Sequence, residues 1–156
     1  MLLYHDAQEQ FRMFQKSLWD IVKHLPLRLL GLNSAPYYIY DGGGDEIGYS
    51  KRSFSASEYT FHIAQNTYVL RAHSGKKHSL TMNQRQIALF FMKYDGKYCN
   101  DGKYCIDFAE QDKTLVPLFL LFAIFIDVQY YTHKGATTYT FISRDKHKEM
   151  SKWTPE

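Results

Sequence analysis

The longest apolar run in the chain covers residues 115–126 and is followed at once by Asp127. No polar side chain interrupts it. A helix that is apolar on all sides is buried either in a protein core or in a membrane. A membrane span needs about 20 apolar residues, whereas runs of roughly 10–14 more often belong to a buried helix. The run therefore predicts a helix enclosed by the rest of the chain.

Before this run, apolar and polar side chains alternate, which is the period-two pattern of half-buried strands. Tyr59, Phe61 and Ile63, for example, alternate with polar or small neighbours. A glycine-rich turn at residues 41–44 joins two such segments, as in a hairpin. Strands are expected at residues 2–4, 11–14, 37–40, 46–52, 59–63, 68–73, 80–82, 86–94, 103–108 and, after the helix, 138–142.

A sheet of many short strands can avoid exposed edges by closing into a barrel, whose interior must then be filled. The apolar helix that follows the strands suits that interior. We therefore expect a mostly β fold (β+α), a closed antiparallel β-barrel wrapped around a central hydrophobic C-terminal helix. Residues 1–145 are expected to form this single domain.

One short N-terminal helix is expected in addition, at residues 17–25. Leu18, Ile21, Val22 and Leu25 recur there at helical spacing, Ser17 can cap the start, and a proline follows the end. Its apolar stripe packs on its own domain or, in the alternative, binds a partner protein. Residues 146–156 are expected to be a loosely held polar tail.

Composition adds little to this fold. The net charge of +3 and the 17% aromatic content suit a basic, β-rich protein of one domain. The first residues lack the features of a signal peptide, and two cysteines make no disulfide framework. We therefore expect a cytoplasmic protein, peripheral at the membrane if it binds lipid.

The order of these elements resembles the tubby C-terminal-like superfamily, which includes tubby, phospholipid scramblase and LURP-one-related proteins. Three stretches carry the resemblance: the hairpin at residues 38–52, the Gln86-Ile-Ala-Leu segment with the strands after it, and the helix ending at Asp127. The resemblance implies a barrel of about twelve strands around a central helix, and it supplies the idea of a lipid ligand. No residue of tubby's headgroup site can be matched here.

Basic residues adjoin the expected turns, and on a barrel they could gather at one rim. The candidate ligand-binding residues are Lys51, Arg52, Lys76, Lys77 and Arg85. Each basic group near an anionic surface contributes about 1 kcal/mol, and salt weakens the attraction. The alternative is a solvated rim whose charges are balanced by nearby acids.

Other chemistry has weaker support. Cys99 and Cys105 could bond or share a metal, but two free thiols are favoured, and a zinc site lacks further ligands. His62, His73 and His78 could converge on a metal, which is a minor hypothesis. The chain contains no nucleophile elbow, phosphate loop or metalloprotease motif, so no catalytic residue, metal or cofactor is assigned.

The sequence thus predicts a non-enzymatic cytoplasmic module that binds anionic phospholipid headgroups or a membrane surface through basic turn residues. The alternative is a protein–protein interaction module of unknown partner. Nucleic acid is disfavoured as a partner, because the alternating aromatic side chains are expected to face the core.

Overall fold

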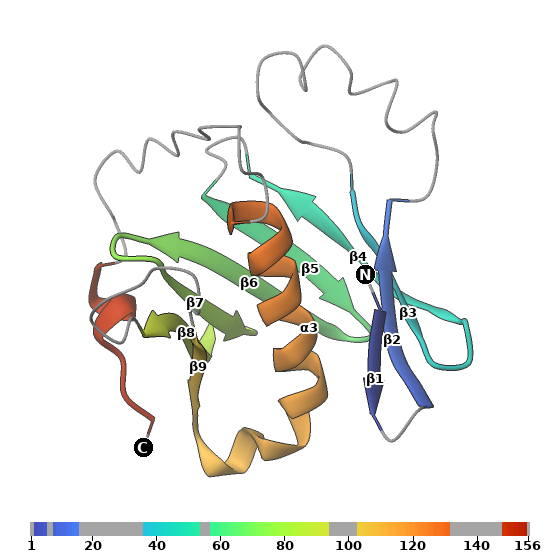
Figure 1. Ribbon diagram of the computed structural model, residues 1–156. Helices are drawn as coiled ribbons and strands as arrows, with labels where there is room; N and C mark the ends of the chain where they lie inside the picture. Colours follow the sequence, from blue (N-terminus) through green and yellow to red (C-terminus); the bar gives the residue numbers. More distant parts are fainter. Residues whose placement is uncertain are drawn as a thin grey trace.

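The computed structural model describes residues 2–5, 8–15, 36–53, 57–93, 103–131 and 148–155. The strands of this part form one antiparallel sheet in which consecutive strands are neighbours (Figure 1). They are β1 (Leu2–His5), β2 (Gln8–Phe14), β3 (Tyr38–Asp41), β4 (Glu46–Arg52), β5 (Glu58–Ile63), β6 (Asn66–His73), β7 (Lys77–Met82), β8 (Arg85–Lys93) and β9 (Lys103–Phe108).

The central helix lies against one face of this sheet. A 3₁₀ turn, η1 (Glu110–Leu115), leads into α3 (Val116–Ile126), and a π-helical turn, η2 (Asp127–Tyr131), continues it. Phe119, Phe122 and Phe125 of α3 are at most 1% exposed. The ring centroid of Phe122 lies 4.9 Å from that of Phe61 on β5. We call the face of the sheet toward α3 the inner face and the opposite one the outer face.

The helical stretch Glu110–Tyr130 has 21 residues and, among the described residues, is long and apolar enough to cross a membrane. A buried core helix meets the same criterion of length and composition. Here the phenylalanine side chains of α3 pack on Phe61, Tyr59 and Tyr68 of the sheet, which is the packing of a core helix.

Alternation along the strands decides which side chains meet the helix. Tyr59, Phe61 and Ile63 are 2%, 0% and 7% exposed, as the sequence pattern predicts. Gly48 of β4 lies opposite Ile63, and a Cβ atom at Gly48 would collide with the carbonyl oxygen of His62. Only glycine therefore allows β4 to approach β5 at this point.

The predicted closed barrel is wrong. Within the described residues the outermost strands, β1 and β9, do not pair, and they lie on either side of α3 (Figure 1). Closure requires a matching tilt and stagger of the strands, which the alternation of side chains does not specify. Because the sheet is open, Leu120 of α3 remains 44% exposed.

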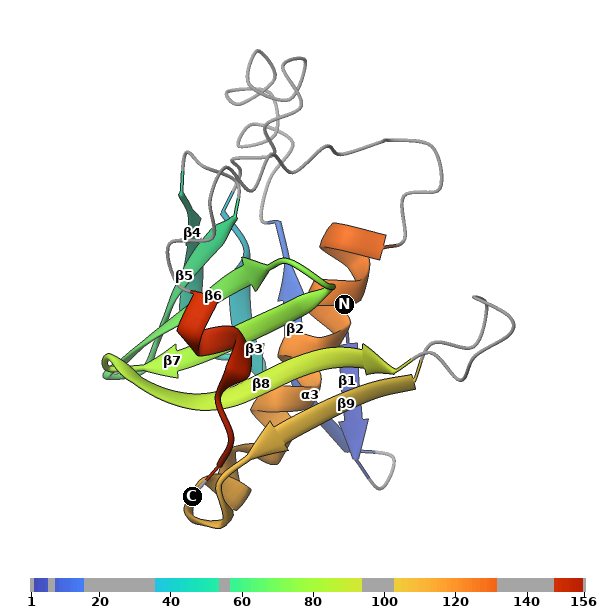
Figure 2. The same ribbon diagram turned by 90° about the vertical axis from the view of Figure 1, so that its left-hand side faces the viewer.

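Two further predictions, the helix at residues 17–25 and the strand at residues 138–142, lie outside the described residues. The tail at residues 146–156 was expected to be loosely held, and the structure of its described residues differs from this expectation. Residues Lys148–Lys152 form a 3₁₀ turn, η3, that lies over the outer face of the sheet, with Ser151 only 8% exposed (Figure 2).

Candidate functional site: a polar cavity on the outer face

A cavity of about 560 Å³ opens on the outer face, over β6 and β7. This volume is within the range of small-molecule sites. Its wall consists of alternate residues of β6, the end of β7 with the following turn, and one residue of η3. The lining residues are Thr67, Val69, Arg71, Thr81, Asn83, Gln84 and Met150.

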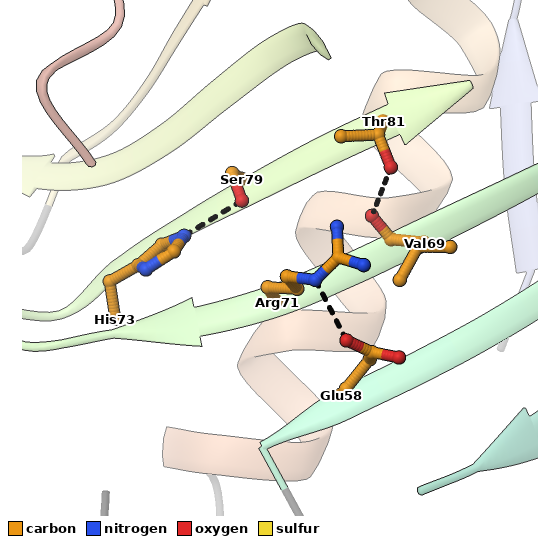
Figure 3. Close-up of polar contacts among 6 residues, drawn as sticks. All are labelled: Glu58, Val69, Arg71, His73, Ser79 and Thr81. Carbon is orange, nitrogen blue, oxygen red and sulfur yellow. Dashed lines mark hydrogen bonds and ion pairs between the residues drawn. The ribbon is translucent and has the colours of Figure 1, made fainter. Parts of the chain in front are cut away.

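Arg71 is the cation of this cavity. Its Nε donates a hydrogen bond of 2.7 Å to Oε2 of Glu58, the residue opposite on β5. The side chain of Arg71 is 21% exposed and that of Glu58 is 31% exposed. Figure 3 shows the two terminal nitrogens of Arg71 directed away from Glu58, toward Val69 and Thr81. A guanidinium has five N–H donors, so Glu58 fixes its plane while leaving the outer fork available to an anion.

The polar side chains beside Arg71 are held by the backbone of the sheet. Thr81 is 3% exposed, and its Oγ1 donates a hydrogen bond of 3.4 Å to the Val69 carbonyl (Figure 3). Asn83 accepts a hydrogen bond from the Thr67 amide and donates one to Asn66. Asn83 and Gln84 both have positive φ, which matches the type I′ turn of a tight hairpin. The wall is therefore largely preformed.

The C-terminal turn η3 supplies the remaining wall of the cavity. Lys77 Nζ donates a hydrogen bond of 2.9 Å to the Ser151 carbonyl, and Gln86 Nε2 donates one of 3.0 Å to the Met150 carbonyl. These two side chains come from β7 and β8, beneath η3 (Figure 2). They hold Met150 at the edge of the cavity.

A histidine–serine pair adjoins the cavity on the same face. The distance from His73 Nε2 to Ser79 Oγ is 2.7 Å, within the reach of a base and its nucleophile (Figure 3). However, His73 is 3% exposed and Ser79 is fully buried. A substrate would have no access to the serine hydroxyl, so we interpret the pair as a satisfied buried hydrogen bond.

Five basic residues were predicted from the sequence to bind a ligand. Two of them, Lys51 and Arg52, are the last residues of β4, and their side chains lie on opposite faces of the sheet. Lys51 is exposed on the outer face, in the same cross-strand row as Thr60, Val69 and Thr81. Arg52 points to the inner face, where its guanidinium carbon lies 5.5 Å from the centroid of the Tyr59 ring. Burial raises the pKa of Tyr59 to about 12.

The other three cations do not form one rim. Lys76 and Lys77 stand at the β6–β7 turn and Arg85 at the β7–β8 turn, which are opposite ends of the six-residue strand β7, about 20 Å apart. Both oxygens of Asp112 bind Arg85, at 2.6 and 2.9 Å, and this hydrogen bonding raises the pKa of Arg85. Arg85 therefore belongs to an ion pair within the fold, and the side chain of Lys77 binds the backbone of η3.

The three histidines of the metal hypothesis lie in separate environments. His62 and His73 are on the outer face, beside Thr67 and Ser79, whereas His78 is on the inner face, 4.7 Å from the Tyr130 ring. In the part of the chain that the structure covers, no group of three or more His, Cys, Asp or Glu is placed to hold a metal. Cys105 has a free thiol, and Cys99 lies outside the described residues.

Sequence reasoning missed Arg71, because it considered cations next to turns. A signal was present, since Thr67, Val69, Arg71 and His73 occupy the positions of β6 that alternate with its core residues. An arginine within a strand, on the face opposite the core, points to a partner across the sheet or to a ligand.

Comparisons of this chain with protein-family models, with curated proteins and with solved structures found no match. The resemblance to the tubby C-terminal-like superfamily therefore stays a prediction.

Proposed function

We propose that the protein is a non-enzymatic binding module that recognises an anionic group, a phosphate or a carboxylate, in the outer-face cavity. The observation that carries this proposal is the orientation of Arg71. Its terminal nitrogens are directed toward Val69 and Thr81, which line the cavity with Arg71, while Glu58 holds its Nε (Figure 3). A planar guanidinium fork matches the paired oxygens of both groups.

The surroundings of Arg71 support an anion of small size. The amide side chains of Asn83 and Gln84 line the same cavity and can donate further hydrogen bonds, whereas the single hydroxyl proton of Thr81 is donated to the Val69 carbonyl. Lys51, exposed in the row of Val69, adds positive charge on the same face. The anion can belong to a free metabolite or to the headgroup of a phospholipid, and these sources share the chemistry that Arg71 recognises.

Isothermal titration with inorganic phosphate and sedimentation with vesicles of phosphatidylglycerol or phosphatidylcholine test the proposal. Arg71→Gln removes the fork, and we expect it to weaken binding of the anion about 10-fold or more, the usual effect of losing a charge-assisted hydrogen bond. Binding of phosphate alone identifies a free anion. Binding of phosphatidylglycerol vesicles alone identifies a lipid headgroup.

Lys76→Gln is the matched control, because it removes the same charge from an exposed turn outside the cavity. The melting temperature of both variants verifies that they are folded. If Lys76→Gln weakens binding and Arg71→Gln does not, a basic turn binds the anion and the proposed cavity site is wrong.

A further inference from the structure

A row of ring-bearing side chains crosses the outer face and leads to the cavity. The strand register places one member on each of β2 to β5, directly opposite its neighbours: Phe14, Tyr38, Tyr49 and His62. The next position in the row is Thr67, which lines the cavity. Neighbouring strands are about 4.8 Å apart, so the row from β2 to β6 is about 19 Å long.

The row is accessible because it lies on the face away from α3. The residues that alternate with it, Met13, Ile39 and Ile63, are at most 7% exposed and belong to the core. Phe14 and Tyr49 are 38% and 39% exposed, and they are two of the three exposed large hydrophobic side chains among the described residues. These aromatic side chains contradict the expectation that the alternating rings all face inward.

Contacts between the rings hold the row in place. Phe14 stacks on Tyr40, the neighbour of the row on β3, with centroids 4.9 Å apart and planes 4° from parallel. Tyr49 and His62 lie 5.0 Å apart. A ring whose rotamer is already fixed loses little entropy when it receives a flat ligand.

Positive charge borders the row on both sides. Arg12 of β2, opposite Tyr40, is exposed on one side, and Lys51 of β4 is exposed on the other. Arg71 follows in the cavity. Two nearby carboxylates are engaged, since Glu46 accepts a hydrogen bond from Tyr40 Oη at 3.4 Å and Glu58 binds Arg71.

We propose that the outer face binds single-stranded nucleic acid, with bases stacked on the row at Tyr49 and Phe14 and phosphates bound by Lys51 and Arg12. The inference rests on the proposed function in one respect, because it assigns a phosphate of the strand as the anion at Arg71. Aromatic rings on an open sheet, bordered by cations, form a stacking surface for unpaired bases, every one of which has a π-face.

Two other polyanionic partners fit this surface less well. A duplex keeps its bases stacked on one another and cannot place them on Tyr49. A membrane requires apolar side chains that enter the hydrocarbon, and among the described residues Phe14 is the one exposed large side chain of this face that has no polar group. Tyr49 and His62 present polar edges, which suit bases better than lipid chains.

Fluorescence anisotropy with a labelled ten-nucleotide oligothymidylate, read at several salt concentrations, tests the inference. We expect Tyr49→Ala to weaken binding about fivefold or more, the effect of losing one base–ring stack. Lys51→Gln should reduce the salt slope by about 0.7, the value for one phosphate contact to a single strand. Leu120→Ala, an exposed position on α3, is the control and should change neither quantity.

Three outcomes overturn the inference: no binding of the oligothymidylate, equal binding of Tyr49→Ala, or equal competition by a duplex or by phosphatidylglycerol vesicles. Parallel titration with inorganic phosphate separates this failure from failure of the proposed function. Arg71-dependent phosphate binding without oligothymidylate binding supports the cavity site and contradicts the binding of nucleic acid. Oligothymidylate binding that needs Tyr49, without Arg71-dependent binding of inorganic phosphate, supports the ring row and contradicts the cavity site.

Discussion

His78 is a basic side chain in an apolar place. It is 3% exposed on the inner face and packs against the ring of Tyr130. Burial lowers the pKa of His78 from 6.5 to about 3, with a smaller contribution from the charge of nearby His73. In the unfolded chain His78 is therefore protonated as the pH falls below about 6.5, whereas in the folded protein it stays neutral down to about pH 3.

The stability that neutral His78 allows is complete above about pH 6.5 and is lost as the pH falls from there toward 3. Between about pH 7 and pH 5 we expect the free energy of unfolding to fall by about 2 kcal/mol from this group. His78→Leu should remove most of that fall in urea unfolding measured at the two pH values. An unchanged fall in the variant would assign the pH dependence to other groups.

At the scale of single residues, the sequence predicts the face on which a side chain lies better than it predicts the partner of that side chain. The inward direction of Tyr59 and Phe61 follows from alternation alone. The partner of a cation does not, because Arg85 binds Asp112 27 positions away and Lys77 binds the Ser151 carbonyl 74 positions away. Such contacts depend on the relative placement of distant elements, so the predicted basic rim could not be checked without the fold.

At the scale of elements, the strong hydrophobic patterns of the sequence predicted several strands and the central helix correctly. The predicted strands at residues 46–52 and 103–108 are β4 and β9, and the apolar run contains α3. The outward ring row was missed because composition gives the number of aromatic residues but not their faces. In β4 the core position is Ser50, 1% exposed, so its alternation places Tyr49 outside.

Two positions on α3, two residues apart and on different sides of the helix, test how this helix is oriented. Phe122 is fully buried against Phe61 and Tyr68, whereas Leu120 is 44% exposed. Phe122→Asp places a charge in the core and should cost more than the roughly 3–5 kcal/mol of a Phe→Ala change, which unfolds a domain of ordinary stability.

Leu120→Asp is the matched variant, because it adds the same charge to the same helix at a position open to solvent. It should remain folded and melt cooperatively in circular dichroism. A cooperative transition for Phe122→Asp, or unfolding of Leu120→Asp, would contradict the packing of α3 against the inner face.

At the scale of the whole molecule, the error in the sequence prediction was closure. An apolar helix and a run of strands determine that the sheet must cover the helix, and they leave open how far around it the sheet extends. Strand alternation has the same form in an open sheet and in a barrel. The open arrangement leaves β1 and β9 as edges within the described residues.

The attachment of the C-terminal turn to β7 and β8 is likewise a property of the whole chain. Lys77→Gln removes the hydrogen bond from Nζ to the Ser151 carbonyl, a bond whose net contribution is about 1 kcal/mol. Loss of that bond should accelerate amide hydrogen exchange in η3 about fivefold, because local opening becomes easier by this free energy. Mass spectrometry of the C-terminal peptide measures the change, and Lys76→Gln, the exposed neighbour, should leave it unaltered. Equal exchange in the Lys77 variant and the wild type would mean that η3 is held by its other contacts, Gln86 among them, and that Met150 keeps its place on the cavity wall without Lys77.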